Sequence, residues 1–525
     1  MLSRSSGCTR RSFLAGTVAA SGLLADNGTA VAKTNCGQVR GVKNDAVYLF
    51  KGIPYAGSPE GSGRFKPAPK LKPWTGVRDA LVYGPQSIQA ADPMWPKDWK
   101  PAVSAEDCLY LNIWTQGIAD GKKRPVMFYS HGGGFATGNG GAEVVPQNQF
   151  HDGGALARDY DVVVVTHNHR LNIMGYLYLG DLLGEEYADS GMAGMLDIAA
   201  ALRWVHDNIA SFGGDPGKVM IWGESGGGYK TSVLTAMPAA KGTFQRASVE
   251  SGSGLRMRTR ESAAETARAV LDALGLTEKQ ARQLLTIPSK KLIDAMQALP
   301  SNRGLGFSPM VDGHNLPAHP YDPVAPAVSA DVPLITGINK DETLFFYRST
   351  DAMSMDEDGL KKRLGEMLKD NAGRVLEVYR RSRPDATPAE LFIAITTAQW
   401  MGNNAIRMAE RKAALHAAPV YMYIFAYDSP SPGPTPYHSG SGHAAEMPFK
   451  FNHVPGDPAT DKKARAARNM SKAWATFART GNPSWDGIPN WPAYTLDRRS
   501  TMILDAECKV IGDPYREERI LWENL

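Results

Sequence analysis

One pentapeptide restricts the fold of this chain more than any other segment. It is Gly223-Glu224-Ser225-Gly226-Gly227, and it directly follows the apolar run at residues 219–222. This order predicts a buried strand, a tight turn and a helix, with Ser225 exposed at the tip of the turn as a nucleophile. Glycines two positions before and after the serine let the strand and the helix approach each other closely. A glycine-rich loop whose serine only caps the helix is the alternative, and the pentapeptide alone does not separate the two.

The rest of the chain favours an α/β fold. Residues 124–130 and 161–166 are continuous apolar runs, as expected for strands buried on both faces of a parallel sheet. Residues 194–212 have helical spacing and end at the terminator Gly213-Gly214-Asp215-Pro216. Further strands are expected at 247–250, 333–338 and 420–427, and helical regions at 255–300 and 352–418. Alternating strands and helices predict one large sheet with helices on both faces, and the two helical regions are expected to form pocket walls above it.

A nucleophilic serine needs a base and a carboxylate that orients the base. In α/β hydrolases these partners follow the serine in the order acid, then histidine. The acid candidate is Glu342, just after the predicted strand at 333–338, and its neighbour Asp341 is an equal rival. The histidine candidate is His443, in a glycine-containing loop, with His438 as its rival. A histidine base predicts that activity declines in acid near a pKa of about 6.5.

A second glycine-rich segment, His131-Gly132-Gly133-Gly134-Phe135, directly follows the predicted strand at 124–130. Glycines allow backbone angles that aim several N–H groups at one point, which is what an oxyanion hole requires. A nucleotide-phosphate loop is the competing interpretation. It fails because the lysine and serine of a P-loop are missing, and no Gly-x-Gly-x-x-Gly pattern opens a helix here.

Together these residues resemble the type-B carboxylesterase family, which includes the cholinesterases. The resemblance extends from about Gly37 to the C-terminus. Besides the two glycine-rich segments, it rests on residues 50–56, 64–65, 104–114, 168–171, 201–205, 208–216 and 482–483. It implies an α/β-hydrolase fold, with a large, mostly parallel central sheet, helices on both faces and helical insertions over the active site.

The resemblance also implies roles for individual residues. It makes Ser225 the nucleophile, His443 the general base and acid, and Glu342, rather than Asp341, the orienting acid. It assigns the oxyanion amides to Gly133, Gly134 and Gly226. It places two structural ion pairs, Arg64 with Glu106 and Arg170 with Asp197.

Several positions depart from the family pattern. Gly226 stands where the family usually has alanine, so the turn is expected to be less stiff. Cys108 matches a cysteine that is normally bridged to an upstream one, but residues 84–89 contain none, so we expect that bridge to be absent. Trp95 loosely resembles the tryptophan that holds quaternary ammonium groups in cholinesterases, and a pocket-wall role is expected for it instead. Three other tryptophans, Trp99, Trp222 and Trp400, are candidates for an apolar pocket or for the core.

The N-terminal sequence has the pattern of a targeting segment. Arg10 and Arg11 precede an apolar run at residues 13–25, a pattern that resembles a twin-arginine export signal. Small residues at 30–32 suit a signal peptidase, so we expect a signal peptide at 1–32 and a single hydrolase domain at 33–525. Such signals deliver folded proteins, which predicts a periplasmic or secreted enzyme. An uncleaved anchor is the alternative, and no stable membrane insertion is expected after cleavage.

Net charge and histidine spacing argue against a nucleic-acid-binding protein and against a metalloprotein. The chain of 525 residues has a formal net charge of +4, and the candidate signal accounts for about half of it. So small a charge argues against nucleic acid as a partner. His167 and His169 lack nearby acidic or histidine ligands in the sequence, so no metal is expected, and no organic cofactor either. Nothing in the sequence indicates an oligomeric state.

The function expected from these residues is hydrolysis of a small-molecule carboxylic ester through an acyl-enzyme. Two alternatives remain open at this point. One is hydrolysis of a carbamate or amide by the same residues. The other is a non-catalytic binding module of the cholinesterase-like fold.

Overall fold

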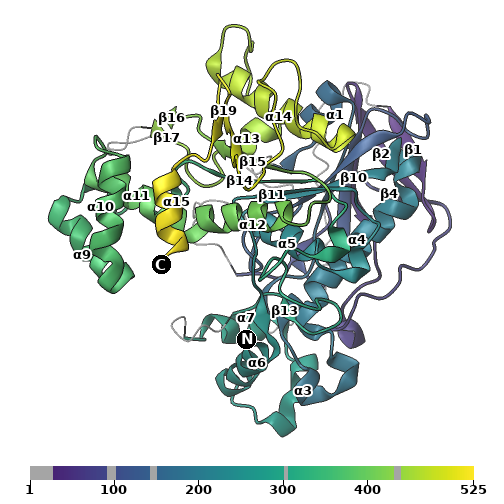
Figure 1. The fold of residues 1–525 in the computed structure, drawn as a ribbon. Coiled ribbons are helices and arrows are strands. Elements are labelled where there is room, and N and C mark those ends of the chain that lie inside the picture. The colour runs from purple at the N-terminus through teal and green to yellow at the C-terminus, as the bar shows by residue number, and fades with distance from the viewer. Residues whose placement is uncertain (1–27, 91–101, 142–150, 301–305, 431–438) are drawn as a thin grey trace, which may run out of the picture.

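A computed structural model describes residues 28–90, 102–141, 151–300, 306–430 and 439–525. Its centre is a sheet of thirteen strands in the order β1-β2-β3-β7-β9-β8-β10-β11-β14-β15-β18-β19, with β4 paired to β2 (Figure 1). The strands are β1 Thr29–Lys33, β2 Gln38–Asn44, β3 Val47–Pro54, β4 Val77–Asp79, β7 Tyr110–Thr115, β8 Arg124–Ser130, β9 Val163–His167, β10 Gly214–Glu224, β11 Arg246–Glu250, β14 Leu334–Asn339, β15 Val420–Phe425, β18 Ser500–Leu504 and β19 Lys509–Gly512.

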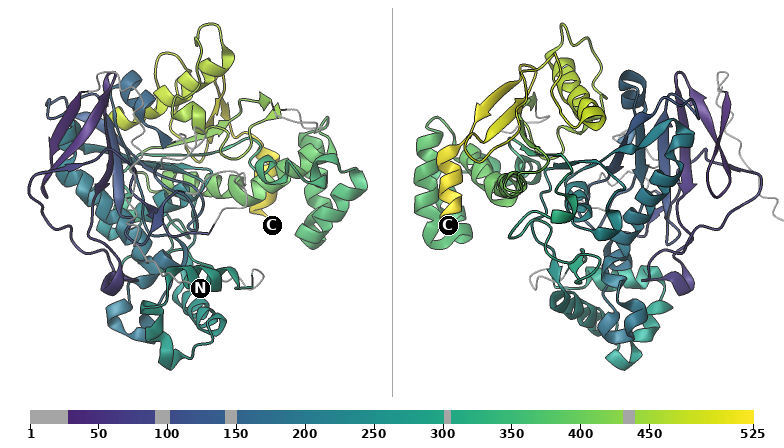
Figure 2. Two further views of the ribbon diagram at one scale, coloured as in Figure 1. Left: turned by 180° about the vertical axis from the view of Figure 1, so that it is seen from behind. Right: turned by 45° about the vertical axis from the view of Figure 1, so that its right-hand side comes forward.

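The middle of the sheet is parallel, from β9 to β18, and its two ends are antiparallel. Every residue of β8, β9, β14 and β15 is buried, which explains why these strands read as continuous apolar runs. The strands predicted from the sequence are confirmed, with ends shifted by a few residues. The N-terminal strands and the C-terminal pair β18–β19 lie at opposite ends of the sheet (Figure 2).

Helices cover both faces of the sheet, as the resemblance implied. The helices are α1 Gly154–Tyr160, α2 Asn172–Tyr176, α3 Gly180–Leu183, α4 Ala193–Asn208, α5 Gly226–Leu234, α6 Arg260–Ala273, α7 Ser289–Gln297, α9 Glu357–Leu368, α10 Ala372–Ser382, α11 Pro388–Thr397, α12 Asn403–Ala413, α13 Met447–Lys450, α14 Lys462–Thr480 and α15 Arg516–Glu523. Alternate residues of β8 enter different cores: Val126 and Phe128 belong to the core that includes α4 and α12, whereas Met127 and Tyr129 belong to the one that includes α14. The sheet is therefore sandwiched between helical layers, and the expected α/β-hydrolase architecture is confirmed.

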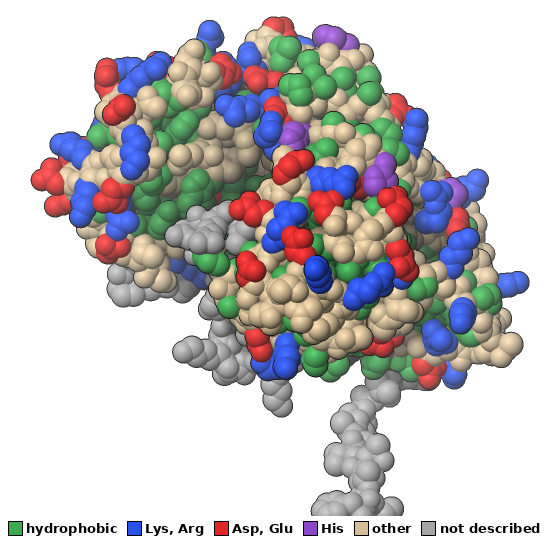
Figure 3. Space-filling view, turned by 90° about the horizontal axis from the view of Figure 1, so that it is seen from below, with side chains coloured by type: hydrophobic (Ala, Val, Ile, Leu, Met, Phe, Trp, Pro, Cys, Tyr) green, Lys and Arg blue, Asp and Glu red, His purple; other side chains and the backbone are tan. Residues whose placement is uncertain are grey.

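The two expected helical insertions are present, and each has a small apolar core of its own. Helices α6 and α7 share a core with α2, while α9, α10 and α11 share one with α15. The second group forms a lobe at the left of Figure 1. Seen from below, hydrophobic side chains gather in a hollow between this lobe and the body of the molecule (Figure 3).

Strand β1 crosses the boundary that the sequence suggested for the signal peptide. Thr29–Lys33 pairs antiparallel with β2, and its side chains Ala30 and Ala32 are buried. Cleavage after Ala32 would remove four of the five residues of this strand. Residues 1–27, which hold the paired arginines, lie outside the described residues. Among those described, no helix combines the length and the apolar character needed to cross a membrane.

Both ion pairs implied by the resemblance are present. Arg64 Nε lies 2.9 Å from Glu106 Oε2. Arg170 contacts both oxygens of Asp197, at 2.8 and 2.6 Å, and its backbone N–H donates to the same carboxylate. The Arg170 and Asp197 side chains are 3% and 0% exposed. This pair joins the loop after β9 to α4, so it fixes a helix against the sheet.

We predict that Arg170→Met lowers the free energy of unfolding by about 3–5 kcal/mol, because it leaves the Asp197 carboxylate buried without a positively charged partner. Urea denaturation of the full chain measures this loss. The matched control is Lys290→Met, which breaks a surface pair whose side chains are 84% and 53% exposed. Such a pair contributes under about 1 kcal/mol. Equal losses in the two variants would contradict the structural role of Arg170.

Candidate active site

The structure places Ser225 at a strained turn between β10 and α5. Its backbone has φ 57° and ψ −120°, a conformation that non-glycine residues rarely adopt. The Ser225 N–H donates to the carbonyl of Glu250 at 2.9 Å. A Cβ atom added at Gly223 or at Gly227 would lie 2.6 or 2.0 Å from the carbonyl oxygen of Ser130. Neither position accepts a side chain, so the geometry agrees with the strand-turn-helix predicted from the pentapeptide.

His443 and Glu342 come together beside this turn. His443 Nδ1 lies 2.6 Å from Glu342 Oε2, and the His443 N–H donates to the Glu342 carbonyl at 3.0 Å. Glu342 is fully buried, and its second oxygen accepts from the N–H of Asn339. Asp341, the rival acid, accepts from the N–H of Ser441 and lies near Lys340. Geometry thus favours Glu342 as the partner of the imidazole. His438, the rival histidine, lies outside the described residues.

The second nitrogen of His443 faces the residue just before the candidate nucleophile. His443 Nε2 lies 3.2 Å from Glu224 Oε1. The Ser225 hydroxyl makes no hydrogen bond within the described part of the chain. The imidazole therefore lies between two carboxylates, with the serine next in sequence to one of them. Hydrogen bonds of this kind are often incomplete without substrate and tighten only when it binds.

A network of buried charges surrounds this arrangement, and sequence reasoning missed it. Lys450 Nζ lies 2.5 Å from Glu250 Oε2 and 3.1 Å from Glu446 Oε1, and all three side chains are 0% exposed. Glu446 also accepts from Asn339 Nδ2 at 2.6 Å. The carboxylate of Glu250 in turn accepts hydrogen bonds from the indole N–H of Trp474 and the hydroxyl of Ser248. Two acidic residues in the sequence could have indicated this network. They are Glu446, three residues after His443, and Glu250, the last residue of β11.

These contacts shift the pKa values of the central pair. Burial raises the pKa of Glu224, although the nearby imidazole of His443 opposes the rise. Burial alone would lower the pKa of His443, but the carboxylates of Glu224 and Glu342 outweigh it and raise that pKa. A proton is therefore held between Glu224 and His443 to a higher pH than an isolated histidine would allow.

The predicted oxyanion loop lies against the turn. Gly133 and Gly134 have φ values of +81° and +62°, which glycine adopts without strain. Neither N–H donates a hydrogen bond to another described residue, and Gly226 begins α5, where an N–H has no helical partner. A Cβ atom at Gly226 would lie 2.3 Å from Gly134 N. The loop packs so close to the helix that alanine, the residue expected at this position from the resemblance, would not fit.

Aromatic rings line the approach to His443. Phe346 lies with its ring centroid 5.4 Å from that of His443, and Trp400 lies 5.8 Å from Phe346. Phe346 and Trp400 are 37% and 42% exposed, so both side chains are partly open to solvent. Trp222, by contrast, is wholly buried in the core. Trp95 and Trp99 lie outside the described residues.

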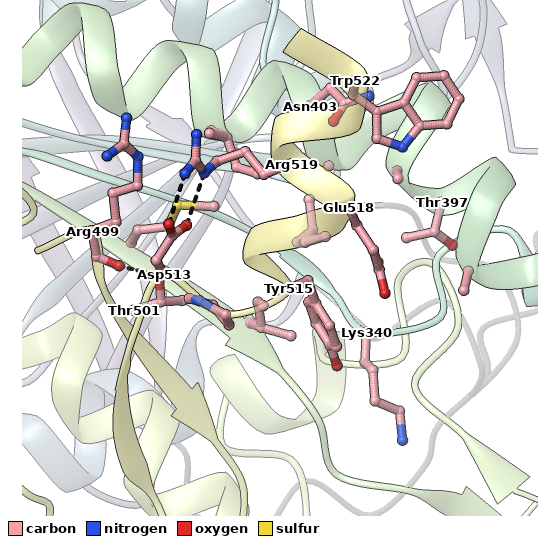
Figure 4. A pocket seen from close by; sticks show the side chains of 18 of the residues that line it. Lys340, Thr397, Asn403, Arg499, Thr501, Asp513, Tyr515, Glu518, Arg519 and Trp522 are labelled. Atoms are coloured by element: carbon pink, nitrogen blue, oxygen red, sulfur yellow. Dashed lines mark hydrogen bonds and ion pairs between the residues drawn. The ribbon is translucent and has the colours of Figure 1, made fainter. Parts of the chain in front are cut away.

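A separate cavity of about 70 Å³ lies behind the C-terminal helix α15. Its walls include Ile338 and Ile424 from the sheet, with the ion pair of Arg519 and Asp513 at its rim (Figure 4). None of the candidate site residues lines it. We therefore assign this cavity no part in the chemistry at Ser225.

Three side chains elsewhere have the spacing of metal ligands. Asp189, Asp312 and His314 bring one ligand atom each within 4.8 Å of the others, and no further such group occurs among the described residues. Asn315 Nδ2 already donates to both aspartates, and His314 Nε2 lies 2.7 Å from Asp189. Hydrogen bonding explains this group without a metal.

Comparison with known proteins identifies the family and agrees with the fold. The model of the Carboxylesterase family matches residues 28–521. The para-nitrobenzyl esterase of Bacillus subtilis (strain 168) is 37% identical over 503 residues, covering 93% of this chain and 97% of its own. The phenmedipham hydrolase of Pseudarthrobacter oxydans is 31% identical over 515 residues, covering 93% and 98%.

Solved structures show the same relationship. A carboxylesterase of Geobacillus stearothermophilus superposes with a TM-score of 0.80 at 37% identity, over 94% of this chain and 99% of its own. An esterase of Clostridium hathewayi that hydrolyses aliphatic aromatic polyesters gives a TM-score of 0.80 at 30% identity, over 95% and 99%. The chain is a carboxylic ester hydrolase of the carboxylesterase family.

Proposed function

We propose that this enzyme hydrolyses small-molecule esters through a Ser225–His443–Glu342 triad and an oxyanion hole made by the amides of Gly133, Gly134 and Gly226. The observation that carries the proposal is the position of the His443 imidazole. One of its nitrogens lies 2.6 Å from a buried carboxylate, and the other faces the residue next to Ser225. A neutral imidazole held in this way has the tautomer that a general base needs.

In the proposed reaction, His443 Nε2 turns from Glu224 to Ser225 and accepts the proton of its hydroxyl. The serine oxygen attacks the acyl carbon, and the carbonyl electrons move onto the oxygen that the three amides stabilise. The tetrahedral adduct collapses, the bond to the leaving alcohol breaks, and His443 gives that alcohol its proton. A water molecule then repeats the sequence and releases the carboxylic acid.

We predict that Ser225→Ala lowers kcat for 4-nitrobenzyl and 4-nitrophenyl esters by about 10⁴- to 10⁶-fold, because no other group replaces the nucleophile. Steady-state kinetics measure the loss, and circular dichroism checks that the fold is kept. The control is Ser471→Ala, a buried serine of α14 that bonds the carbonyl of Ala467. Residual activity in Ser225→Ala within tenfold of the native enzyme would contradict the proposal and favour a different nucleophile or a binding module.

We predict that the acid limb of the kcat/KM profile lies above the ordinary histidine pKa of about 6.5. The carboxylates of Glu224 and Glu342 raise the pKa of His443, so the base is lost to protonation at a higher pH. Glu224→Gln removes one of these charges and should move the acid limb to lower pH by about one unit or more. An acid limb that stays in place in Glu224→Gln would show that Glu224 does not control the base.

We propose further that the protein is exported in folded form through its paired arginines. Because β1 is part of the sheet, we expect cleavage to occur before Thr29, upstream of the position suggested by the sequence. Mass spectrometry of the exported protein should find a mature chain that retains residues 29–32, and replacing Arg10 and Arg11 by lysine should leave the protein in the cytoplasm. A mature chain starting at Lys33 would contradict the placement of the cut.

A further inference from the structure

Lys230 is buried directly behind the predicted oxyanion loop. It lies on α5, five residues after Ser225, and is 0% exposed. Its Nζ donates to the carbonyl of His131 at 2.8 Å. His131 is the residue from which Gly132, Gly133 and Gly134 continue.

No carboxylate in the described part of the chain forms an ion pair with Lys230. The charge of Lys230 acts on three histidines that cluster together: the His131 and His169 centroids lie 4.9 Å apart, and those of His167 and His169 lie 5.4 Å apart. Burial lowers the pKa of all three imidazoles, and the charge of Lys230 lowers each further, so they supply no negative charge. Burying an amine without a counter-ion is unfavourable. A lysine buried in this way beside the candidate active site is therefore a candidate for a functional role.

The loop that Lys230 touches is held by Asn172 at its far end, where the carbonyls of Phe135 and Ala136 accept from Asn172, but its glycines have few contacts of their own. Gly133 and Gly134 have no side chains, and within the described residues the carbonyl of Gly133 accepts only from the N–H groups of Ala136 and Thr137 and the hydroxyl of Thr137. Gly226 and Lys230 are four residues apart and so lie on the same face of α5. Gly226 contacts Gly134 at one end of the loop, and Lys230 holds the carbonyl of His131 at the other.

We propose that Lys230 is a positioning residue for the oxyanion hole, because its hydrogen bond fixes the peptide plane between His131 and Gly132. With this plane fixed at one end and Gly226 in contact at the other, the amides of Gly133 and Gly134 stay aimed at the point where the oxyanion forms. The inference rests on the proposed function of these amides. Stabilisation by such donors depends on their being oriented before the charge develops.

A second buried lysine offers a matched control. Lys412, at the end of α12, is 2% exposed and donates from Nζ to the carbonyls of Ser329 and Ala330 at 2.8 and 3.0 Å. These carbonyls precede β14, at the edge of the parallel sheet opposite to Ser225 and Glu342. Lys412 therefore shares the burial and carbonyl bonding of Lys230 without its position.

The experiment compares Lys230→Met with Lys412→Met in the full chain. For each variant we would measure urea denaturation, kcat and KM for a 4-nitrophenyl ester, and the inhibition constant of an aryl trifluoromethyl ketone, whose adduct with serine carries an oxyanion. Lys230→Met should lower kcat by about tenfold or more and weaken the ketone by a similar factor, with KM within about twofold. Lys412→Met should lose comparable stability while keeping kcat and ketone affinity.

The nitrophenol burst counts active sites, so kcat refers to correctly folded protein only. Unchanged kcat and ketone affinity in Lys230→Met, or equal losses in Lys412→Met, would overturn the proposal. If Lys230→Met does not fold, Lys230→Leu, which also lacks a donor, serves in its place, and a normal kcat per active site in that variant would likewise overturn it. Failure of the hydrolase proposal itself is distinguishable, because the native enzyme would then show no burst.

Discussion

The contact on which the rest of the site depends is the packing of α5 against the end of β8. The backbone of Gly227 lies so close to the Ser130 carbonyl that no side chain fits between them, and Gly223 is equally constrained. This contact forces the chain to turn within one residue, and Ser225 takes up the strain with a positive φ. The same contact brings the segment after Ser130, the glycine loop, against the start of α5.

The strain at Ser225 is maintained because its backbone is bonded to the buried end of a neighbouring strand. The N–H of Ser225 is held by Glu250, which itself belongs to the buried charge network of Lys450 and Glu446. A network of this kind is stable only when each member has its partner, since an unpaired buried charge costs several kcal/mol. The fold thus stabilises the turn and the imidazole through one connected set of polar contacts.

Much of this architecture could be predicted from the sequence. Strands buried on both faces appear in the sequence as apolar runs, so the sequence alone predicts β8, β9, β14 and β15. The turn at Ser225 was predictable because only glycines fit beside it. The choice between Asp341 and Glu342 was not, since adjacent residues at a strand end point in different directions, and only the resemblance favoured the glutamate.

Other features had no usable signal in a single sequence. Lysine is ordinarily a surface residue, so neither Lys230 nor Lys450 indicated a buried position. Glu224 lies inside the diagnostic pentapeptide, yet nothing there shows that its carboxylate would reach the second nitrogen of His443. The residues at 30–32 suit a cleavage site and an edge strand equally well, and the pairing of β1 with β2 could not be foreseen from them.

The central claim is that His443 activates Ser225. Its most direct test is the rate at which an organophosphate labels the protein, with the modified peptide identified by mass spectrometry. The account predicts that the label falls on Ser225 in the native enzyme and that His443→Asn slows labelling by several orders of magnitude. Labelling at another residue, or labelling of Ser225 at the native rate in His443→Asn, would contradict it.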